Sequence, residues 1–414
     1  MRFVKSLCVL SVALLLSACG GGGGGGDPVA TPTNPVTPGT TTASNVLTLV
    51  VDSGPAGVAG RIANLPYATV TVCPPGSTRN CQTIDHVIVD TGSTGLRLLA
   101  SALGGTAGFP QQANTAGTPL AQCATFISGY TWGSVRSADV TLGGLTASAL
   151  PIQIIADPAY PTVPTACSNT GTSQNSLAEL GAKGILGISH FAQDCGSACA
   201  GTAVAAAYYA CPTAGSCTPT ALPVAQQVAN PIARLPSDNN GSLIQFPAVS
   251  SAGQTTATGA LVLGIGTRAN NAVGSAVAYG VNASTGLLST TYNGRTYSRS
   301  AFDSGSNFYF FTDAALPTCT SSSATAFYCP PTARDLSAVI TGSNGVSGTV
   351  AFRIANANAL FTTSVNTAVL PDIGATLGSS NSFLWGMPFF YGRSVFTSLS
   401  GAATPLGVGP FVAF

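Results

Sequence analysis

Asp90-Thr91-Gly92-Ser93 ends one apolar, strand-like run of this chain, and Asp303-Ser304-Gly305-Ser306 ends another. A single Asp in a tight, Gly-containing turn is common and has no functional meaning by itself. Here each tetrad is followed later in the chain by an apolar pair that ends in Gly, first Ile185-Leu186-Gly187 and then Leu384-Trp385-Gly386. Elements that recur in the same order indicate a duplicated unit. We therefore expect two related lobes that bring two carboxylates together.

The rest of the chain has the pattern of a β-protein. From Val46 onward, short alternating apolar runs are broken by Gly, Pro and Asn, and the 414 residues include 49 glycines. Asn293-Gly294 stands between two such runs and predicts a β-hairpin. The best helical candidate is Ala203–Tyr209, inside an insertion rich in Cys and Ala. The sequence thus predicts an all-β or mainly β class.

These elements resemble those of a pepsin-like aspartic protease, and the resemblance covers nearly everything after residue 45. It implies a bilobal fold with the active-site cleft between two related β-lobes, residues 46–269 and 270–414. The segment Tyr130-Thr131-Trp132-Gly133-Ser134 resembles the flap that closes over substrate. That likeness makes Tyr130 and Trp132 candidates for substrate binding. The whole chain also resembles a bacterial lipoprotein family whose function is uncharacterised.

The resemblance implies that Asp90 and Asp303 are the catalytic pair of an endopeptidase that needs no cofactor and no metal ion. Two carboxylates about 3 Å apart cannot both ionise, so such a pair shares a proton. The ionised partner then takes a proton from water, and the protonated partner polarises the scissile carbonyl. The glycines would let each turn close, the serines would bond the carboxylates, and Thr91 and Ser304 would link the turns. The expected supporting residues are Thr91, Gly92, Ser93, Ser304, Gly305 and Ser306.

One position departs from the family pattern. Arg97 stands where pepsin-like enzymes usually carry a Trp that contacts the flap. Its cation would lower the pKa of the carboxylates if it reached them, or it would point to solvent. The altered cleft keeps an alternative open, a catalytically inactive protein of this fold that binds peptide, glycan or a protein partner. A structural or adhesive lipoprotein is a third possibility, whereas the two complete tetrads favour the enzyme acting as a monomer on a peptide or protein.

The first residues read as an export signal, with Arg2 and Lys5 before a short apolar run. Leu16-Ser17-Ala18-Cys19-Gly20 resembles a bacterial lipoprotein cleavage box. It implies a signal peptide over 1–18, lipid on Cys19, and a Gly/Pro/Thr-rich tether over 19–45. The expected location is the bacterial cell envelope, held by lipid only, on the periplasmic or surface side of the outer membrane. A secreted protein with ordinary signal cleavage is the alternative.

The numbers of cysteines and of charged residues bear on disulfide formation, metal binding and nucleic-acid binding. Of the 12 cysteines, Cys8 leaves with the signal and Cys19 takes lipid, so ten remain for five disulfides in an oxidising compartment. The pairs Cys73/Cys81 and Cys319/Cys329 enclose short loops and are the easiest to propose. The spacings lack the paired C-x2-C pattern of zinc sites, and there are two histidines, so we expect no metal. With 7% charged residues there is no basic patch for nucleic acid.

Overall fold

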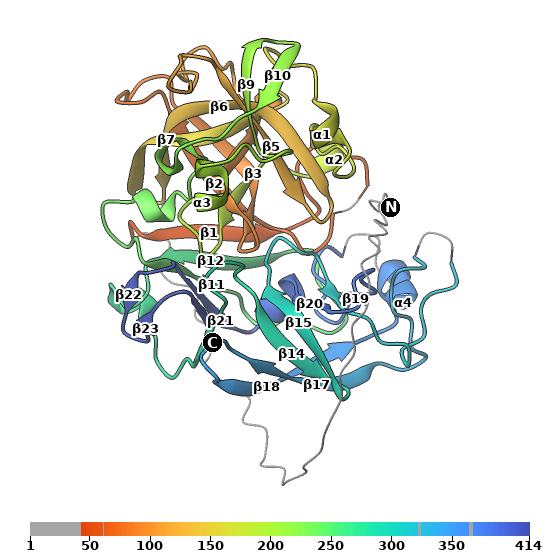
Figure 1. Cartoon of the computed structure of the whole chain (residues 1–414). Helices are drawn as coiled ribbons and strands as arrows, with labels where there is room; N and C mark the ends of the chain where they lie inside the picture. Colours follow the sequence, from red (N-terminus) through yellow and green to blue (C-terminus); the bar gives the residue numbers. More distant parts are fainter. Residues whose placement is uncertain (1–42, 61, 322–323, 364–366) are drawn as a thin grey trace.

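The computed structural model describes residues 43–60, 62–321, 324–363 and 367–414. Two β-rich lobes lie one above the other, the first orange to green and the second teal to blue (Figure 1). Strands dominate, and the predicted mainly β, bilobal fold class is confirmed. The helical segments are α1 (Thr165–Ser168), α2 (Leu177–Leu180), α3 (Ser197–Ala200), α4 (Ala357–Thr363), η1 (Ala100–Ala102), η2 (Val224–Gln226), η3 (Ile232–Arg234), η4 (Ala269–Asn271) and η5 (Met387–Phe390).

The first lobe is a curled sheet with the strand order β10-β9-β5-β6-β7-β4-β8-β3-β2. The long strand β6 also pairs with β2, where Val72 lies opposite Val140, so the sheet folds back on itself. Its interior is filled by alternating aliphatic side chains, as expected for strands with one buried face. The strands are β2 (Pro66–Cys73), β3 (Gln82–Asp90), β4 (Thr94–Leu99), β5 (Leu120–Phe126), β6 (Gly129–Leu142), β7 (Leu145–Ile155), β8 (Gly184–Ile188), β9 (Tyr208–Thr213) and β10 (Ser216–Pro219).

A group of central strands joins the two halves of the chain. The same sheet continues from β2 through β1-β12-β11-β21-β24-β13, so β21, near the end of the chain, pairs with β11 of the predicted first lobe. Leu243 of β11, for example, lies opposite Phe396 of β21. This continuity fixes the lobes relative to one another, while the predicted boundary at 269/270 stays a prediction. The strands are β1 (Val46–Val51), β11 (Gly241–Gln245), β12 (Ala257–Leu263), β13 (Ala278–Gly280), β21 (Ser394–Ser398) and β24 (Phe411–Ala413).

The second lobe contains a separate sheet with the order β18-β17-β14-β15-β20-β16-β19. The predicted hairpin is confirmed, because Asn293 and Gly294 turn the chain between β14 and β15 with φ of 49° and 72°. A cluster of aromatic rings, including Phe383 and Trp385, fills its core. The strands are β14 (Leu288–Tyr292), β15 (Arg295–Phe302), β16 (Tyr309–Phe310), β17 (Arg334–Thr341), β18 (Ser347–Ile354), β19 (Gly374–Ala375) and β20 (Ser382–Trp385), and β22 (Ala403–Thr404) pairs with β23 (Gly407–Val408) apart from it.

The predicted helix over Ala203–Tyr209 is wrong. Tyr208 and Tyr209 belong to β9, which pairs with β5, and both side chains are buried. Ala206 has a φ of 57°, which a right-handed helix does not allow. Burial of the two tyrosines against β5 therefore outweighs the helix propensity of the alanines.

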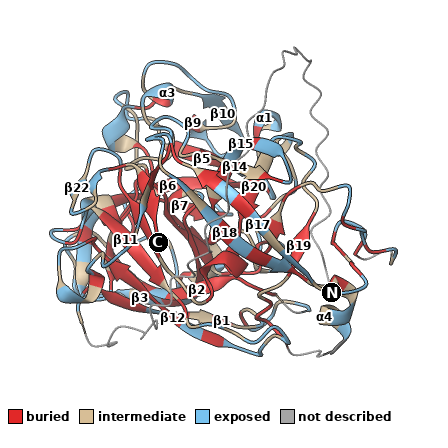
Figure 2. Ribbon diagram, turned by 90° about the horizontal axis from the view of Figure 1, so that it is seen from below, coloured by how far each residue is buried: buried red, intermediate tan, exposed pale blue. Residues whose placement is uncertain are grey.

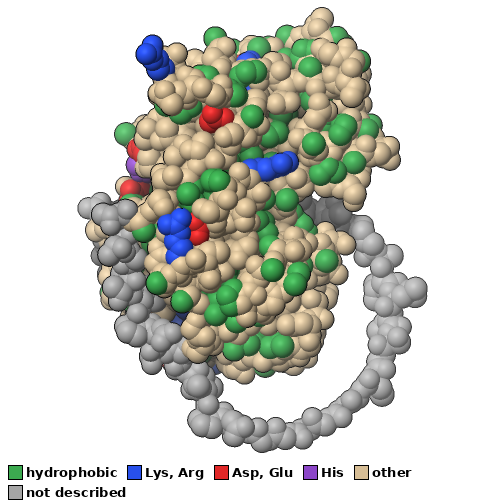
Figure 3. Space-filling view, turned by 90° about the vertical axis from the view of Figure 1, so that its left-hand side faces the viewer, with side chains coloured by type: hydrophobic (Ala, Val, Ile, Leu, Met, Phe, Trp, Pro, Cys, Tyr) green, Lys and Arg blue, Asp and Glu red, His purple; other side chains and the backbone are tan. Residues whose placement is uncertain are grey.

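Five disulfides form, as predicted. They include Cys73–Cys81 and Cys319–Cys329, the two pairs that the short loops suggested. The others are Cys123–Cys167, Cys195–Cys199 and Cys211–Cys217. Buried residues concentrate along the strands, whereas the exposed ones lie mainly in the outer loops and turns (Figure 2). Charged side chains are sparse on the face in Figure 3, in keeping with the composition.

The predicted signal peptide and the lipid-bearing Cys19 lie outside the described residues. Within the residues that are described, no helix has the length and apolar character needed to cross a membrane.

Candidate active site

Each tetrad begins where a strand of its lobe ends. Asp90 is the last residue of β3, which runs parallel to β8 so that Asp90 lies opposite Gly187. Asp303 follows β15, which runs parallel to β20, and its N–H donates to the carbonyl of Trp385 at 2.9 Å. The two apolar-Gly triplets are therefore the neighbouring strands that hold the two Asp turns in place.

The glycines that end these triplets are required by close packing. A Cβ at Gly187 would lie 2.8 Å from the backbone of Ser93, and a Cβ at Gly386 would collide with the carbonyls of Ser306 and Phe308. Any other residue would push the Asp turn out of position. The recurrence of Gly in both triplets thus has a steric cause.

Within each turn, the carboxylate accepts the same two hydrogen bonds. Asp90 Oδ1 accepts from the N–H of Gly92 at 2.8 Å, and Oδ2 accepts from the Ser93 hydroxyl. Asp303 Oδ1 accepts from the N–H of Gly305 at 2.9 Å, and Oδ2 accepts from the Ser306 hydroxyl at 2.7 Å. The turns are equivalent, so each carboxylate is held by its own tetrad.

A reciprocal set of hydrogen bonds ties the two turns together. Ser304 Oγ accepts from the Thr91 N–H at 3.1 Å and donates to the Val89 carbonyl at 2.7 Å. Thr91 Oγ1 accepts from the Ser304 N–H at 3.0 Å and donates to the Phe302 carbonyl at 2.9 Å. Both side chains are buried, so these bonds are shielded from water.

The two carboxylates face each other across this link. A Cβ built on Gly92 would lie 2.7 Å from the Asp303 carboxylate, and one on Gly305 would lie 2.6 Å from Asp90 Oδ1. The pKa of Asp303 is raised to about 8, because burial removes the group from water and because the Asp90 charge and a hydrogen bond to Asp90 disfavour its ionisation. The pair therefore retains a proton at neutral pH.

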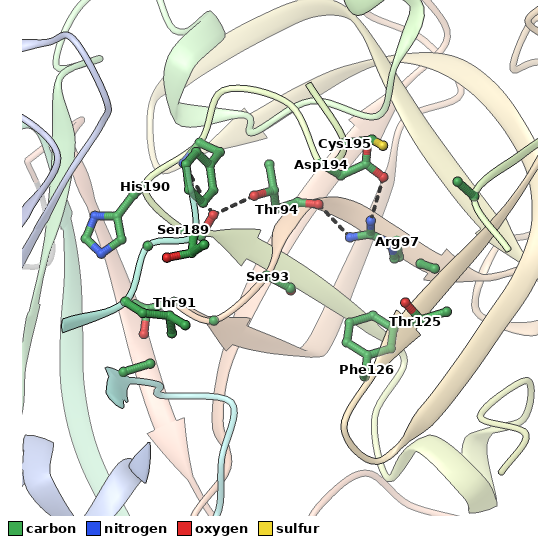
Figure 4. Close-up of a pocket in the computed structure, with 18 of the residues that line it drawn as sticks. Thr91, Ser93, Thr94, Arg97, Thr125, Phe126, Ser189, His190, Asp194 and Cys195 are labelled. Carbon is green, nitrogen blue, oxygen red and sulfur yellow. Dashed lines mark hydrogen bonds and ion pairs between the residues drawn. The ribbon is translucent and has the colours of Figure 1, made fainter. Parts of the chain in front are cut away.

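A cavity of about 710 Å³ is lined by residues of both lobes, among them the neighbours of Asp90 in its tetrad, but by neither Asp90 nor Asp303 (Figure 4). The first lobe contributes Gly92 to Thr94, Arg97 and part of β5, and the second contributes residues 285–288, Ala301 and Phe302. Residues 204–208 of the insertion, which lies between two disulfides, form another part of the wall. The volume of the cavity is large enough for a few residues of peptide.

The β5–β6 hairpin forms one side of this cavity, but the predicted aromatic residues do not face it. Trp132 is 1% exposed, and its Nε1–H donates to the carbonyl of Tyr160 at 3.0 Å. Tyr130 packs in the same interior cluster, which also holds Tyr209. Neither Tyr130 nor Trp132 is among the described residues that line the cavity. Their predicted role in substrate binding therefore stays a prediction.

The strand register alone does not separate the hairpin residues from the cavity, because Cys123 and Thr125 line it as well as Phe126. Tyr130 pairs with Thr125 and Trp132 pairs with Cys123, so these four side chains share one face of the hairpin. Because side chains alternate along a strand, Phe126 projects from the opposite face. Phe126 lines the cavity, and its ring lies 5.7 Å from the guanidinium carbon of Arg97. It is the aromatic residue of the hairpin that is placed to meet a ligand.

Arg97 points neither to the Asp pair nor to solvent, the two outcomes that the sequence left open. It is 3% exposed, and its Nη2 forms an ion pair with Asp194 Oδ2 at 3.1 Å. The Gln122 amide and the Tyr208 hydroxyl also donate to Asp194. Burial raises the pKa of Asp194, and the Arg97 cation opposes that rise. Gln122 and Asp194 are cavity residues that sequence reasoning missed, since nothing in the local sequence links them to Arg97.

Among the described residues, no three His, Cys, Asp or Glu side chains cluster in a way that could hold a metal ion.

Residues 41–414 match the family described as protein of unknown function DUF3443. The chain belongs to this family. Among curated proteins, none matches the sequence significantly. Among solved structures, an aspartic proteinase from Irpex lacteus is similar to this member of the family at 15% sequence identity, with a TM-score of 0.49. That similarity covers 90% of this chain and 96% of the proteinase.

Proposed function

We propose that this chain is an aspartic endopeptidase that hydrolyses peptide bonds with the Asp90–Asp303 pair. The observation that carries the proposal is the pair itself. Two carboxylates face each other, each is held by the same two donors, and Thr91, Gly92 and Ser93 beside Asp90 line a cavity. The raised pKa of Asp303 keeps one proton on the pair up to about pH 8.

In the proposed reaction, a water molecule bound between the carboxylates loses a proton to the ionised member of the pair. The resulting nucleophile attacks the carbonyl carbon of the scissile bond. The protonated member meanwhile hydrogen-bonds the carbonyl oxygen, where negative charge develops. The proton then passes to the leaving amine as the bond to nitrogen breaks. Ser93 and Ser306 keep the carboxylates oriented throughout.

The proposal extends to location and partners. Lipid on Cys19 would anchor the protein to the bacterial envelope, and the Gly/Pro/Thr-rich tether would hold the lobes away from the membrane. In that position a monomer would act on peptides or proteins of the envelope or the surroundings.

Cleavage of a peptide library, read by mass spectrometry, tests the activity. The wild-type protein should cut inside peptides, at a rate that falls as the pH rises through about 8. Asp90→Asn keeps the side-chain size and should lower turnover by about 10²–10⁴-fold or more. Asp372→Asn is the matched control, because Asp372 is another carboxyl with a raised pKa but belongs to neither Asp tetrad. Equal cleavage by wild type and Asp90→Asn would refute the proposal.

A non-catalytic peptide-binding protein is the second candidate. It is favoured by the cavity lining, which includes the insertion residues 204–208 but neither Asp90 nor Asp303. Peptide binding without cleavage between about pH 3 and 8, the range in which Asp303 keeps its proton, would decide for this candidate.

A further inference from the structure

The two residues Ala63 and Asn64, just before β2, are held by hydrogen bonds from the second half of the chain. Asn64 is fully buried, and its N–H donates to the carbonyl of Ala368 at 2.8 Å. Its Nδ2 donates to the carbonyl of Leu370 at 2.8 Å, and its Oδ1 accepts from the N–H of the same residue at 2.8 Å. Oδ1 also accepts from the Tyr391 hydroxyl at 2.8 Å. All four hydrogen bonds join parts of the chain that are distant in sequence.

The second Asp turn is bonded to the same two residues. Asn307 follows the tetrad of Asp303 directly in the chain, and its Nδ2 donates to the carbonyl of Ala63. Ala63 is buried in the same apolar cluster as Phe308, the next residue along the chain. The side chain of Asn307 therefore ties the turn that carries Asp303 to the start of β2.

The start of β2 is in turn connected with the first Asp turn. In β2, Tyr67 lies opposite Ile88 of β3. Ile88 stands two residues before Asp90, the last residue of β3. The hydrogen bond from Asn307 thus joins the turn of one carboxylate to the pair of strands that carries the other. It forms a second bridge between the two turns, in addition to the reciprocal link through the tetrad hydroxyls.

A bridge of this kind matters because the interaction between two carboxylates depends on their separation. The repulsion of like charges weakens as their distance grows and as water enters between them. Burial and, after it, the charge of Asp90 raise the pKa of Asp303. A second Asp turn that moved away from the first would therefore lower this pKa toward its ordinary value.

We propose that Asn307 and Asn64 are positioning residues, which hold the two Asp turns at the separation at which their carboxylates act as a pair. Asn307 acts through the carbonyl of Ala63, and Asn64 fixes Ala63 against the second half of the chain. The consequence for catalysis rests on the proposed endopeptidase function, whereas the pairing of the carboxylates can be measured without turnover. A merely structural role would lower the unfolding temperature of a variant and leave the pKa of Asp303 unchanged.

Asn307→Leu tests the bridge, because Leu keeps the branched shape of the side chain and removes the Nδ2 donor. The pKa of Asp303, followed by NMR of its carboxyl carbon, should fall from about 8 to about 7 or below. Small displacements of catalytic groups cost up to about 10²-fold in rate, so kcat/KM for peptide cleavage should fall by about 10–100-fold. The decline of the rate with rising pH should also begin at a lower pH than in the wild type.

Tyr391→Phe is a milder variant, and Asn240→Leu is the matched control. Tyr391→Phe removes the hydroxyl that bonds Asn64, and it keeps the ring that packs 5.9 Å from that of Phe246. It should lower the same pKa by a smaller amount. Asn240 Nδ2 also donates to a distant carbonyl, that of Ala403 at 3.1 Å, but neither residue belongs to β3 or β15, the strands that lead to the Asp tetrads. Asn240→Leu should therefore retain the wild-type pKa.

Unfolding temperatures measured on the same proteins separate positioning from ordinary stabilisation. The positioning role is overturned if Asn307→Leu and Tyr391→Phe keep the wild-type pKa of Asp303, whatever their unfolding temperatures. It is overturned as well if Asn240→Leu lowers this pKa equally. If Asn307→Leu does not fold, the pKa in Tyr391→Phe decides.

The same measurements distinguish this proposal from the endopeptidase. A lowered pKa in Asn307→Leu and Tyr391→Phe, without peptide cleavage by the wild type, would keep the positioning role and overturn the endopeptidase. Cleavage by the wild type with an unchanged pKa in both variants would do the reverse. If the pKa of Asp303 is not raised in the wild type, the carboxylates do not act as a pair and both proposals fail.

Discussion

Replacing Asp303 by Asn should change how the stability of the protein depends on pH. The pKa of Asp303 is raised from an ordinary value of 3.8, which represents the unfolded chain, to about 8 in the folded protein. Between these values the folded state keeps a proton that the unfolded state has lost. The stability that this group contributes is therefore complete below about pH 4 and is lost as the pH rises through about 8. The amide of the Asp303→Asn variant does not titrate. The unfolding free energy of the variant therefore does not fall with pH through this group.

The magnitude follows from the difference between the two pKa values. Each pKa unit corresponds to about 1.4 kcal/mol, so a difference of about four pKa units sets an upper limit on the order of 5 kcal/mol. Because the proton is shared with Asp90, the measured value should be smaller, about 2–5 kcal/mol. The Asp303→Asn variant should fold, since its amide oxygen can accept from the Gly305 N–H and its amide nitrogen can donate to Ser306 Oγ.

The measurement is the unfolding free energy of wild type and Asp303→Asn between about pH 4.5 and 8.5, the window set by the two pKa values. The variant should gain stability relative to wild type steadily as the pH rises toward about 8. Asp372→Asn is the control, because the pKa of Asp372 is raised to about 6, mainly by burial, so its relative gain should end near pH 6. Parallel curves for wild type and Asp303→Asn across this window would show that the pair does not share a proton.

Three further outcomes are expected. Ser304→Ala removes a buried hydroxyl that links the two Asp turns; it should lower the unfolding free energy by about 1–3 kcal/mol and reduce turnover, and an unchanged protein would show that the link is dispensable. Thiol labelling of the denatured, non-reduced mature protein should give no signal, because the ten cysteines of the two lobes form five disulfides, and a labelled cysteine would contradict that pairing. Cys19→Ala should abolish incorporation of labelled palmitate and release the protein from the membrane fraction; retained label would place the lipid elsewhere.

The parts of the site that the sequence predicts are those fixed by local chemistry and repeated in both halves. A carboxylate held by a Gly N–H and a Ser hydroxyl needs Gly two residues and Ser three residues after the Asp. Because both tetrads have this spacing, each can be recognised from the sequence. The triplets ending at Gly187 and Gly386 are recognisable for the same reason, because the steric demand on their glycines recurs.

The parts that the sequence does not predict depend on register or on contacts distant in the chain. The flap-like segment makes Tyr130 an aromatic candidate near a turn, but strand pairing decides which face it occupies, and that face is the interior. Counting back across the turn at residues 127–128 would have placed Phe126 on the other face. The ion pair between Arg97 and Asp194 joins β4 to the disulfide-bonded insertion, and no local pattern encodes it.

The ion pair also explains how an arginine is tolerated in β4, the strand that follows the first Asp turn. An unpaired cation near the two carboxylates would stabilise their doubly ionised state and lower the pKa on which the shared proton depends. Arg97 instead forms its ion pair with Asp194, so Arg97 and Asp194 together present almost no net charge to their surroundings. The pKa of Asp303 is accordingly set by burial and by Asp90 first. Because Arg97 and Asp194 neutralise each other, the shared proton of Asp90 and Asp303 depends on burial and on their own charges.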